Sequence, residues 1–109
     1  MDAPQPQEEW LTKAAEQDHT DAQEVLGRCY HGGTGVPQSD EKAVYWTRKA
    51  AEKGNMYAQW GLGIHYENGW GVPQSDEKAI EWYTKSLKNG NHWAKEELVK
   101  LWEKGQNGK

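Results

Sequence analysis

A stretch of nine residues occurs twice in this chain. Residues 35–43 read GVPQSDEKA, and residues 71–79 repeat them without a change. The offset of 36 residues lies in the range of roughly 20 to 50 residues that is typical of stacked repeat units. Because each unit of such an array buries its apolar face only against its neighbours, the offset predicts a solenoid and argues against an enzyme.

The same offset relates residues on both sides of this stretch. The matching positions are Ala22, Leu26, Gly27, Tyr30 and Gly33 in the first copy, and Ala58, Leu62, Gly63, Tyr66 and Gly69 in the second. Both ends of the chain also align with parts of the unit. We therefore expect one repeat domain at 8–104, with full repeats at about 22–57 and 58–93, half-repeats at both ends, and disordered tails at 1–7 and 105–109.

Each unit has the apolar spacing of helices, because Ala58, Leu62 and Tyr66 follow one another at intervals of four residues. Residues suited to helix caps flank these segments. They are Ser39, Ser75, Asn55 and Asn91 at helix starts, and Gly54 and Gly90 at helix ends. The expected helices lie near residues 8–17, 20–32, 39–53, 56–68, 75–89 and 92–104.

Charge and hydropathy exclude some functions. The net charge of -4 over 109 residues argues against binding of nucleic acid and would suit a basic partner. No apolar run is long enough to enter a membrane, and the start lacks the pattern of a signal peptide, although a cleaved signal would leave no trace. We expect a soluble protein, as a monomer rather than an oligomer, and the compartment stays open between cytoplasm and periplasm.

The first unit carries a series of spaced motifs in this order: Ala-Gln-x-x-Leu-Gly-x-x-Tyr, Gly-x-Gly-Val, Asp-x-Lys-Ala, Trp and Lys-Ala-Ala. This pattern closely resembles the Sel-1-like repeat (SLR), a relative of the tetratricopeptide repeat. The resemblance implies an all-α, right-handed superhelix of about three helix pairs, with the first helix of each pair on the concave face. It also implies protein–protein interaction, as an adaptor or scaffold. The single cysteine, Cys29, excludes the subgroup with one disulfide per repeat.

The helix expected at 56–68 is apolar on two sides. If Ala58, in the structural stripe, is placed at zero degrees, Trp60, Ile64 and Tyr57 fall near 200, 240 and 260 degrees. The first unit instead has charged side chains at these three positions, namely Glu24, Arg28 and Asp21. The apolar character is therefore a local addition that the repeat itself does not require.

If these helices line the concave face, an aromatic patch forms there and is the expected binding surface for a protein or peptide. Its members are Tyr57, Trp60, Ile64 and Trp93, and its charged border is Arg28, Glu67, Glu96 and Lys100. Trp70, in a link between helices, is a second exposed candidate. The alternative is that these aromatic residues only pack over neighbouring helices. The remaining tryptophans occupy positions that belong to the core stripe of the repeat, and we expect them to be structural. They are Trp10, Trp46, Trp82 and Trp102.

The sequence gives little sign of metal or catalytic chemistry. Cys29 and His31 are two residues apart on a helix and point in nearly opposite directions, and Cys29 with His65 supplies only two ligands. Adjacent carboxylates such as Asp40 and Glu41 suit the start of a helix. We therefore expect no metal, no cofactor and no catalytic residue.

Three alternatives to an adaptor or scaffold stay open. One is an immunity-type protein that neutralises a secreted bacterial toxin or effector by occluding it. A hydrolytic enzyme would require a deep pocket that joins His65 or Cys29 to a perturbed carboxylate. A purely structural protein would stack end to end through its first and last helices.

Overall fold

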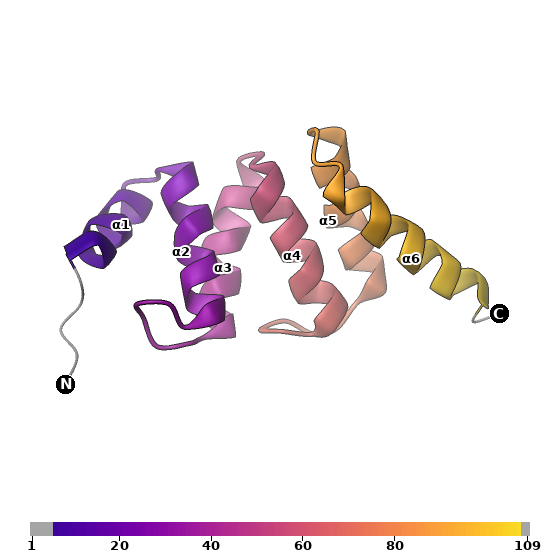
Figure 1. Ribbon diagram of the computed structural model, residues 1–109, viewed down its shortest axis with the longest axis horizontal. Helices are drawn as coiled ribbons and strands as arrows, with labels where there is room; N and C mark the ends of the chain where they lie inside the picture. The colour runs from indigo at the N-terminus through magenta and orange to yellow at the C-terminus, as the bar shows by residue number, and fades with distance from the viewer. Residues whose placement is uncertain (1–5, 108–109) are drawn as a thin grey trace.

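The computed structural model describes residues 6–107 and places six helices side by side along its longest dimension (Figure 1). The helices are α1 (Pro6–Glu16), α2 (Thr20–Gly32), α3 (Asp40–Glu52), α4 (Met56–Asn68), α5 (Asp76–Lys88) and α6 (Trp93–Asn107). The body is elongated, with extents of 51, 28 and 17 Å. Each helix packs mainly against its neighbours in the chain. The expected all-α solenoid is confirmed.

The two outer helices are longer than expected. Helix α1 begins at Pro6 and α6 ends at Asn107, so the helices extend over residues 6–7 and 105–107 of the segments expected to be tails. Proline suits the first position of a helix, where no N–H donor is needed. Gly105 weakens a helix by about 1 kcal/mol but does not end it. Residues 1–5 and 108–109 of the expected tails lie outside the described residues.

The expected caps define the inner helices. Ser39 and Ser75 accept hydrogen bonds through Oγ from backbone N–H groups three residues on, each at 3.2 Å. Asn55 caps α4 in the same way, at 2.9 Å. Gly54 and Gly90 have φ values of 98° and 104°, in the left-handed region that glycine adopts without strain. These local signals fix where one helix stops and the next begins.

The apolar core runs along the stack between consecutive helices. Its largest fully buried side chain is Tyr83 of α5, and Leu26 and Leu62 are buried between the neighbouring helices. Trp46 and Trp82 pack against this core but are only half-buried, so their expected structural role is confirmed with part of each ring at the surface.

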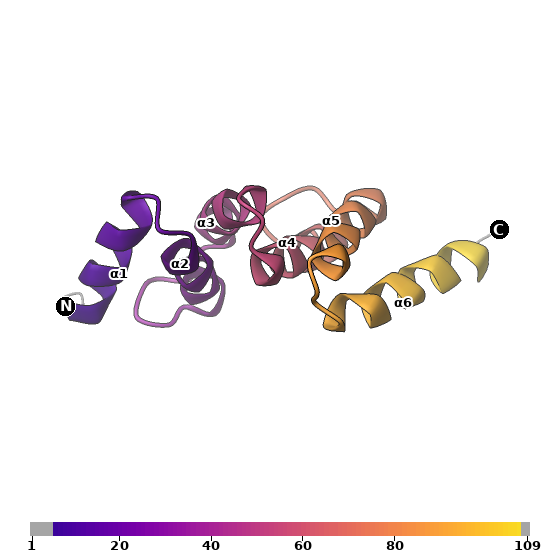
Figure 2. The same cartoon turned by 90° about the horizontal axis from the view of Figure 1, so that it is seen from above.

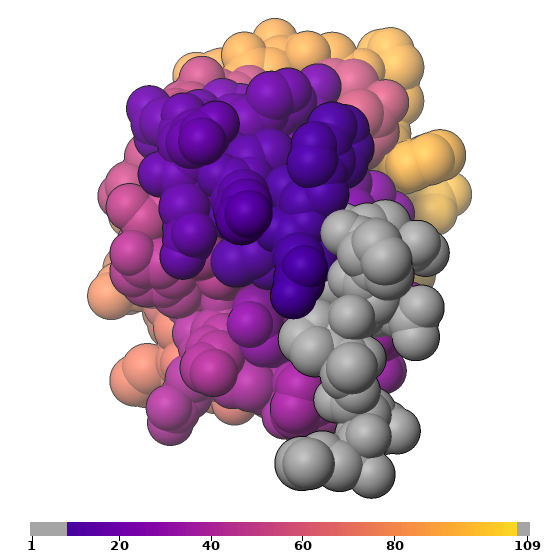
Figure 3. Space-filling model, turned by 90° about the vertical axis from the view of Figure 1, so that its left-hand side faces the viewer, coloured from indigo at the N-terminus to yellow at the C-terminus, as the bar shows by residue number. Residues whose placement is uncertain are grey.

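The expected structural role of Trp10 and Trp102 is wrong. Trp10 on α1 is 74% exposed and Trp102 on α6 is 65% exposed. Inside the stack, a side chain at the repeat position of Trp10 or Trp102 is covered by the next helix. Helices α1 and α6 are the outermost helices of the described chain, so each lacks a covering helix on one side (Figure 1). The end view in Figure 3 shows α1 forming the outer surface at that end.

Candidate functional site

Helices α2, α4 and α6, the first members of the helix pairs, lie along one side of the stack, and α3 and α5 lie along the other (Figure 2). A groove of about 540 Å³ opens between α2, α4 and the start of α6. Its lining is mainly apolar, and Thr47 of α3 contributes to its floor. Larger side chains that line it include Glu24, Arg28, Tyr57, Trp60, Ile64 and Trp93.

The four members of the expected aromatic patch all line this groove. Trp93 lies with its ring centre 5.5 Å from that of Trp60 and 6.4 Å from that of Tyr57, with the rings tilted. Trp93 is 63% exposed and Tyr57 is 46% exposed. Trp60 and Ile64 are half-buried and also pack against the core. The groove therefore has an exposed aromatic rim and an apolar base shared with the core.

One polar atom at the base of the groove is unsatisfied. The indole Nε1 of Trp60 is shielded from solvent and has no hydrogen-bond acceptor among the described residues. A buried donor left in this state costs about 1–3 kcal/mol. A hydrogen-bond acceptor placed next to Trp60 Nε1 would remove this cost.

The expected charged border lies only partly at the groove. Arg28 lines it and pairs with Glu24, one turn earlier on α2, at 2.6 Å between Nε and Oε2. Glu67 instead accepts a hydrogen bond of 2.7 Å from the hydroxyl of Tyr83. Burial, and then this carboxylate, raise the pKa of Tyr83 well above its usual range. Glu96 and Lys100 are exposed on α6 outside the groove lining.

Trp70 belongs to the link between α4 and α5, which folds back onto the preceding repeat. Gly71, with φ of 77°, lies so close to α3 that a Cβ on it would be 2.5 Å from the carbonyl oxygen of Asp40. This close approach brings the ring of Trp70 to 5.0 Å from that of His31, between ring centres. Trp70 is 39% exposed and packs beside His31 at the end of the groove.

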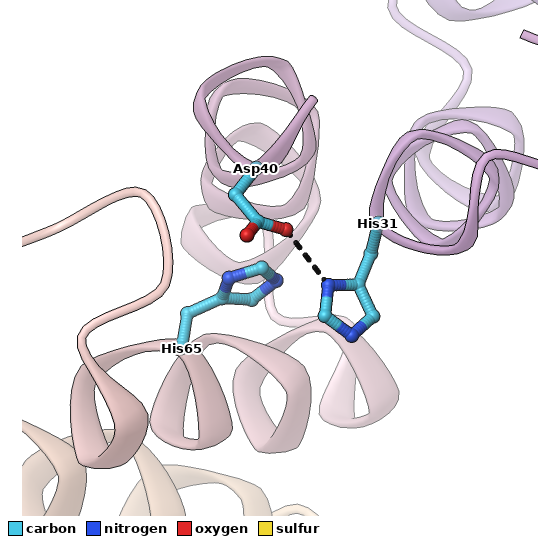
Figure 4. A group of neighbouring side chains, drawn as sticks. All are labelled: His31, Asp40 and His65. Carbon is cyan, nitrogen blue, oxygen red and sulfur yellow. Dashed lines mark hydrogen bonds and ion pairs between the residues drawn. The ribbon is translucent and has the colours of Figure 1, made fainter. Parts of the chain in front are cut away.

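Two histidines and a carboxylate lie close together (Figure 4), and the ring of Trp70 lies beside both histidines. His31 of α2 and His65 of α4 both line the groove, and Asp40 is the first residue of α3. His31 Nδ1 lies 2.9 Å from Asp40 Oδ1. From the sequence alone, Asp40 is explained as a carboxylate at the start of a helix, and nothing in the sequence brings His31 and His65 together. Comparison at the repeat offset does not pair the two histidines, because the residue equivalent to His31 is Glu67 and the residue equivalent to His65 is Cys29.

His65 is held in one orientation. It is buried, and its Nδ1 lies 2.8 Å from the backbone carbonyl oxygen of Trp70. Because that carbonyl can only accept, Nδ1 carries the proton in the neutral ring and Nε2 is left with its lone pair. Burial lowers the pKa of His65, with the nearby His31 acting in the same direction, and this favours the neutral ring.

Comparison with known proteins agrees with this architecture. The family model described as Sel1 repeat matches residues 8–19, 20–55 and 57–91. The chain belongs to the Sel1 repeat family. Sel1 repeats commonly serve as protein-interaction modules and are typically non-catalytic. No curated protein matches the chain.

Several solved structures share the Sel1 fold. One is c5321, a protective antigen present in uropathogenic Escherichia coli strains, with 36% identity and a TM-score of 0.86 over 89% of this chain and 21% of that one. A Sel1 repeat protein from Oxalobacter formigenes is 40% identical, with a TM-score of 0.74 over 75% of this chain and 63% of that one. Helicobacter pylori cysteine rich protein B is 26% identical, with a TM-score of 0.75 over 79% and 65%.

This Sel1 repeat chain therefore spans less than two thirds of each of these proteins. Among the described residues, no helix combines the length and apolar character needed to cross a bilayer.

Proposed function

We propose that the groove between α2, α4 and α6 binds an extended segment of a protein partner. The observation that carries this proposal is a difference between the repeats. The Sel1 fold tolerates charged residues at these positions, because the first unit has Asp21, Glu24 and Arg28 where the second has Tyr57, Trp60 and Ile64. Apolar residues that the repeat pattern does not require, gathered in a groove with exposed rings at Tyr57 and Trp93, are explained by a ligand.

The exposed rings supply the binding energy in this proposal. Trp93 and Tyr57 present large apolar surfaces at the rim, and tryptophan and tyrosine dominate the energetics of protein interfaces. An apolar side chain of the partner would lie between these rings.

Charge favours a partner segment with basic residues. The chain carries a net charge of -4. Glu96 is exposed on α6, and because it follows Trp93 by three residues, the two side chains are neighbours on that helix. Lysine or arginine residues beside the apolar anchor would meet this charge, so binding should weaken as salt is raised. An adaptor and a toxin inhibitor would use the groove in the same way, with different occupants.

The test is selection of peptides from a random displayed library, followed by affinity measurements with purified variants. We expect Trp93→Ala to weaken binding of selected peptides by about 30-fold or more, equivalent to about 2 kcal/mol. Trp102→Ala is the matched control, because Trp102 is on the same helix, is 65% exposed and lies outside the groove lining. Equal effects of the two substitutions would contradict the proposal, as would no effect of either.

A further inference from the structure

Three potential metal ligands converge at the end of the groove from three different helices. His31 lies in the last turn of α2, Asp40 begins α3 and His65 lies on α4. One ligand atom from each lies within 4.8 Å of the other two. Figure 4 shows the two imidazole rings and the carboxylate facing one another. These residues come from two successive repeats, so an ion held among them would join the repeats.

The residues around the cluster have the form of a second coordination shell. His65 Nδ1 donates to the carbonyl of Trp70, which leaves Nε2 available as a ligand. Asp40 Oδ1 accepts a hydrogen bond of 3.0 Å from Gln38 Nε2, a contact that Gln74 and Asp76 repeat at the next junction. Histidines that bind metals characteristically donate their other N–H group to a carbonyl or carboxylate, and this fixes the ring and its tautomer.

We propose that His31, Asp40 and His65 form a binding site for a divalent transition-metal ion of the zinc class. Two imidazoles and one carboxylate suit such an ion, with a fourth position left for water or a group of the groove's ligand. The ion would replace the proton shared between His31 Nδ1 and Asp40 Oδ1. Tetrahedral coordination brings ligand atoms to about 3.3 Å from one another. His31 is exposed at the surface and is free to make this adjustment.

The next junction along the chain shows that the repeat does not require this cluster. The residues equivalent to His31, Asp40 and His65 are Glu67, Asp76 and Leu101. There, Asp76 pairs with a cation of the protein itself, since Lys104 Nζ lies 3.0 Å from its carboxylate. The residue equivalent to Lys104 at the first junction is Asn68, whose amide donates to a backbone carbonyl. An ion at the first junction would supply the charge that Lys104 supplies at the second.

The experiment is calorimetric titration of Zn²⁺ into chelator-treated protein that carries Cys29→Ser, so that the thiol does not contribute. We expect binding of one ion per chain and a higher melting temperature with Zn²⁺. His31→Gln and Asp40→Asn should each lower the affinity by about 100-fold or more, because even loss of a second-shell partner lowers metal affinity by about 10–100-fold. His65→Leu, which introduces the residue of the next repeat, should do the same.

His92→Gln is the matched control, because His92 is an exposed histidine outside the cluster. It should leave both the affinity and the melting shift unchanged. His31→Gln changes an exposed side chain, so circular dichroism should show a folded protein that has lost the ion. The proposal is overturned if the starting protein binds no Zn²⁺, or if the cluster variants bind it as tightly as that protein does. Because no peptide enters this experiment, its result is independent of the proposed partner binding.

Discussion

The ring of Tyr83 packs directly against the backbone of Gly63. A Cβ at residue 63 would lie 2.6 Å from both Cδ1 and Cε1 of that ring, which is closer than van der Waals contact allows. Tyr83 is fully buried and cannot move away without disturbing the core. The absence of a side chain at Gly63 therefore sets how closely α4 and α5 approach.

Gly63→Ala should destabilise the protein by about 1–3 kcal/mol, the usual cost of overpacking a well-packed core. Urea denaturation followed by circular dichroism measures the change. Gly61→Ala is the control on the same helix, because a Cβ there would meet only Thr47 Cγ2 at an ordinary 3.6 Å. Since alanine is favoured over glycine inside a helix by up to about 1 kcal/mol, Gly61→Ala should be neutral or stabilising. Equal losses for both variants would contradict the close-packing argument.

Tyr83→Phe should remove the hydrogen bond to Glu67 and keep the packing of the ring. Hydrogen bonds to charged groups contribute about 1.5–3 kcal/mol, so we expect a loss of that order in the free energy of unfolding. Glu67→Gln retains an acceptor and should cost less. Neither substitution should change peptide affinity, because Glu67 lies outside the groove lining. If Glu67→Gln strongly lowered peptide affinity and left stability unchanged, Glu67 would have the role in partner binding expected from the sequence.

Trp60→Ala should cost about 2–4 kcal/mol of stability, because this half-buried ring packs against the core as well as lining the groove. Trp60→Phe keeps an aromatic ring and removes the unsatisfied Nε1 donor, so it should cost less than about 1 kcal/mol. Thermal or urea unfolding separates the two. If both substitutions are equally harmful, the indole nitrogen makes an interaction that the free protein already needs.

The helix boundaries and the shared face of Trp60, Ile64 and Tyr57 could be predicted because each depends on one helix or one cap. A helical wheel gives the direction of a side chain, but it does not show what lies in that direction. Trp60 therefore packs on the core and also lines the groove, whereas from the sequence these two roles are alternatives. Trp10 matches a register that is covered inside the stack and is exposed at its end.

The cluster of His31, Asp40 and His65 was missed for a related reason. Its members come from three helices, and Asp40 occupies a helix start, where a carboxylate needs no further explanation. Their meeting depends on the approach of α4 to α2 and on the link that carries Trp70 back onto the previous repeat. Sequence comparison at the repeat offset relates equivalent positions, whereas these contacts join positions that are not equivalent.

Asp18 has the only positive φ among the described residues other than glycine, at 71°, and it occupies the register of Gly54 and Gly90. Its carboxylate pairs with Lys53, whose Nζ also donates to the backbone carbonyl of Asp18 at 2.8 Å. The hydrogen bond from Lys53 is the main cause of the lowered pKa of Asp18. The folded state therefore favours the ionised carboxylate.

Asp18→Asn should lower stability slightly at about pH 7, since asparagine also tolerates a positive φ and the change removes mainly the charge. A lowered pKa in the folded state means that the stabilisation is present above the ordinary value of 3.8 and is lost as the pH falls through the folded value. The difference in urea midpoint between wild type and variant should therefore shrink below about pH 4. It should also shrink in about 1 M NaCl, because the pair is exposed and screened. A difference that persists under both conditions would show that Asp18 acts through its backbone conformation instead.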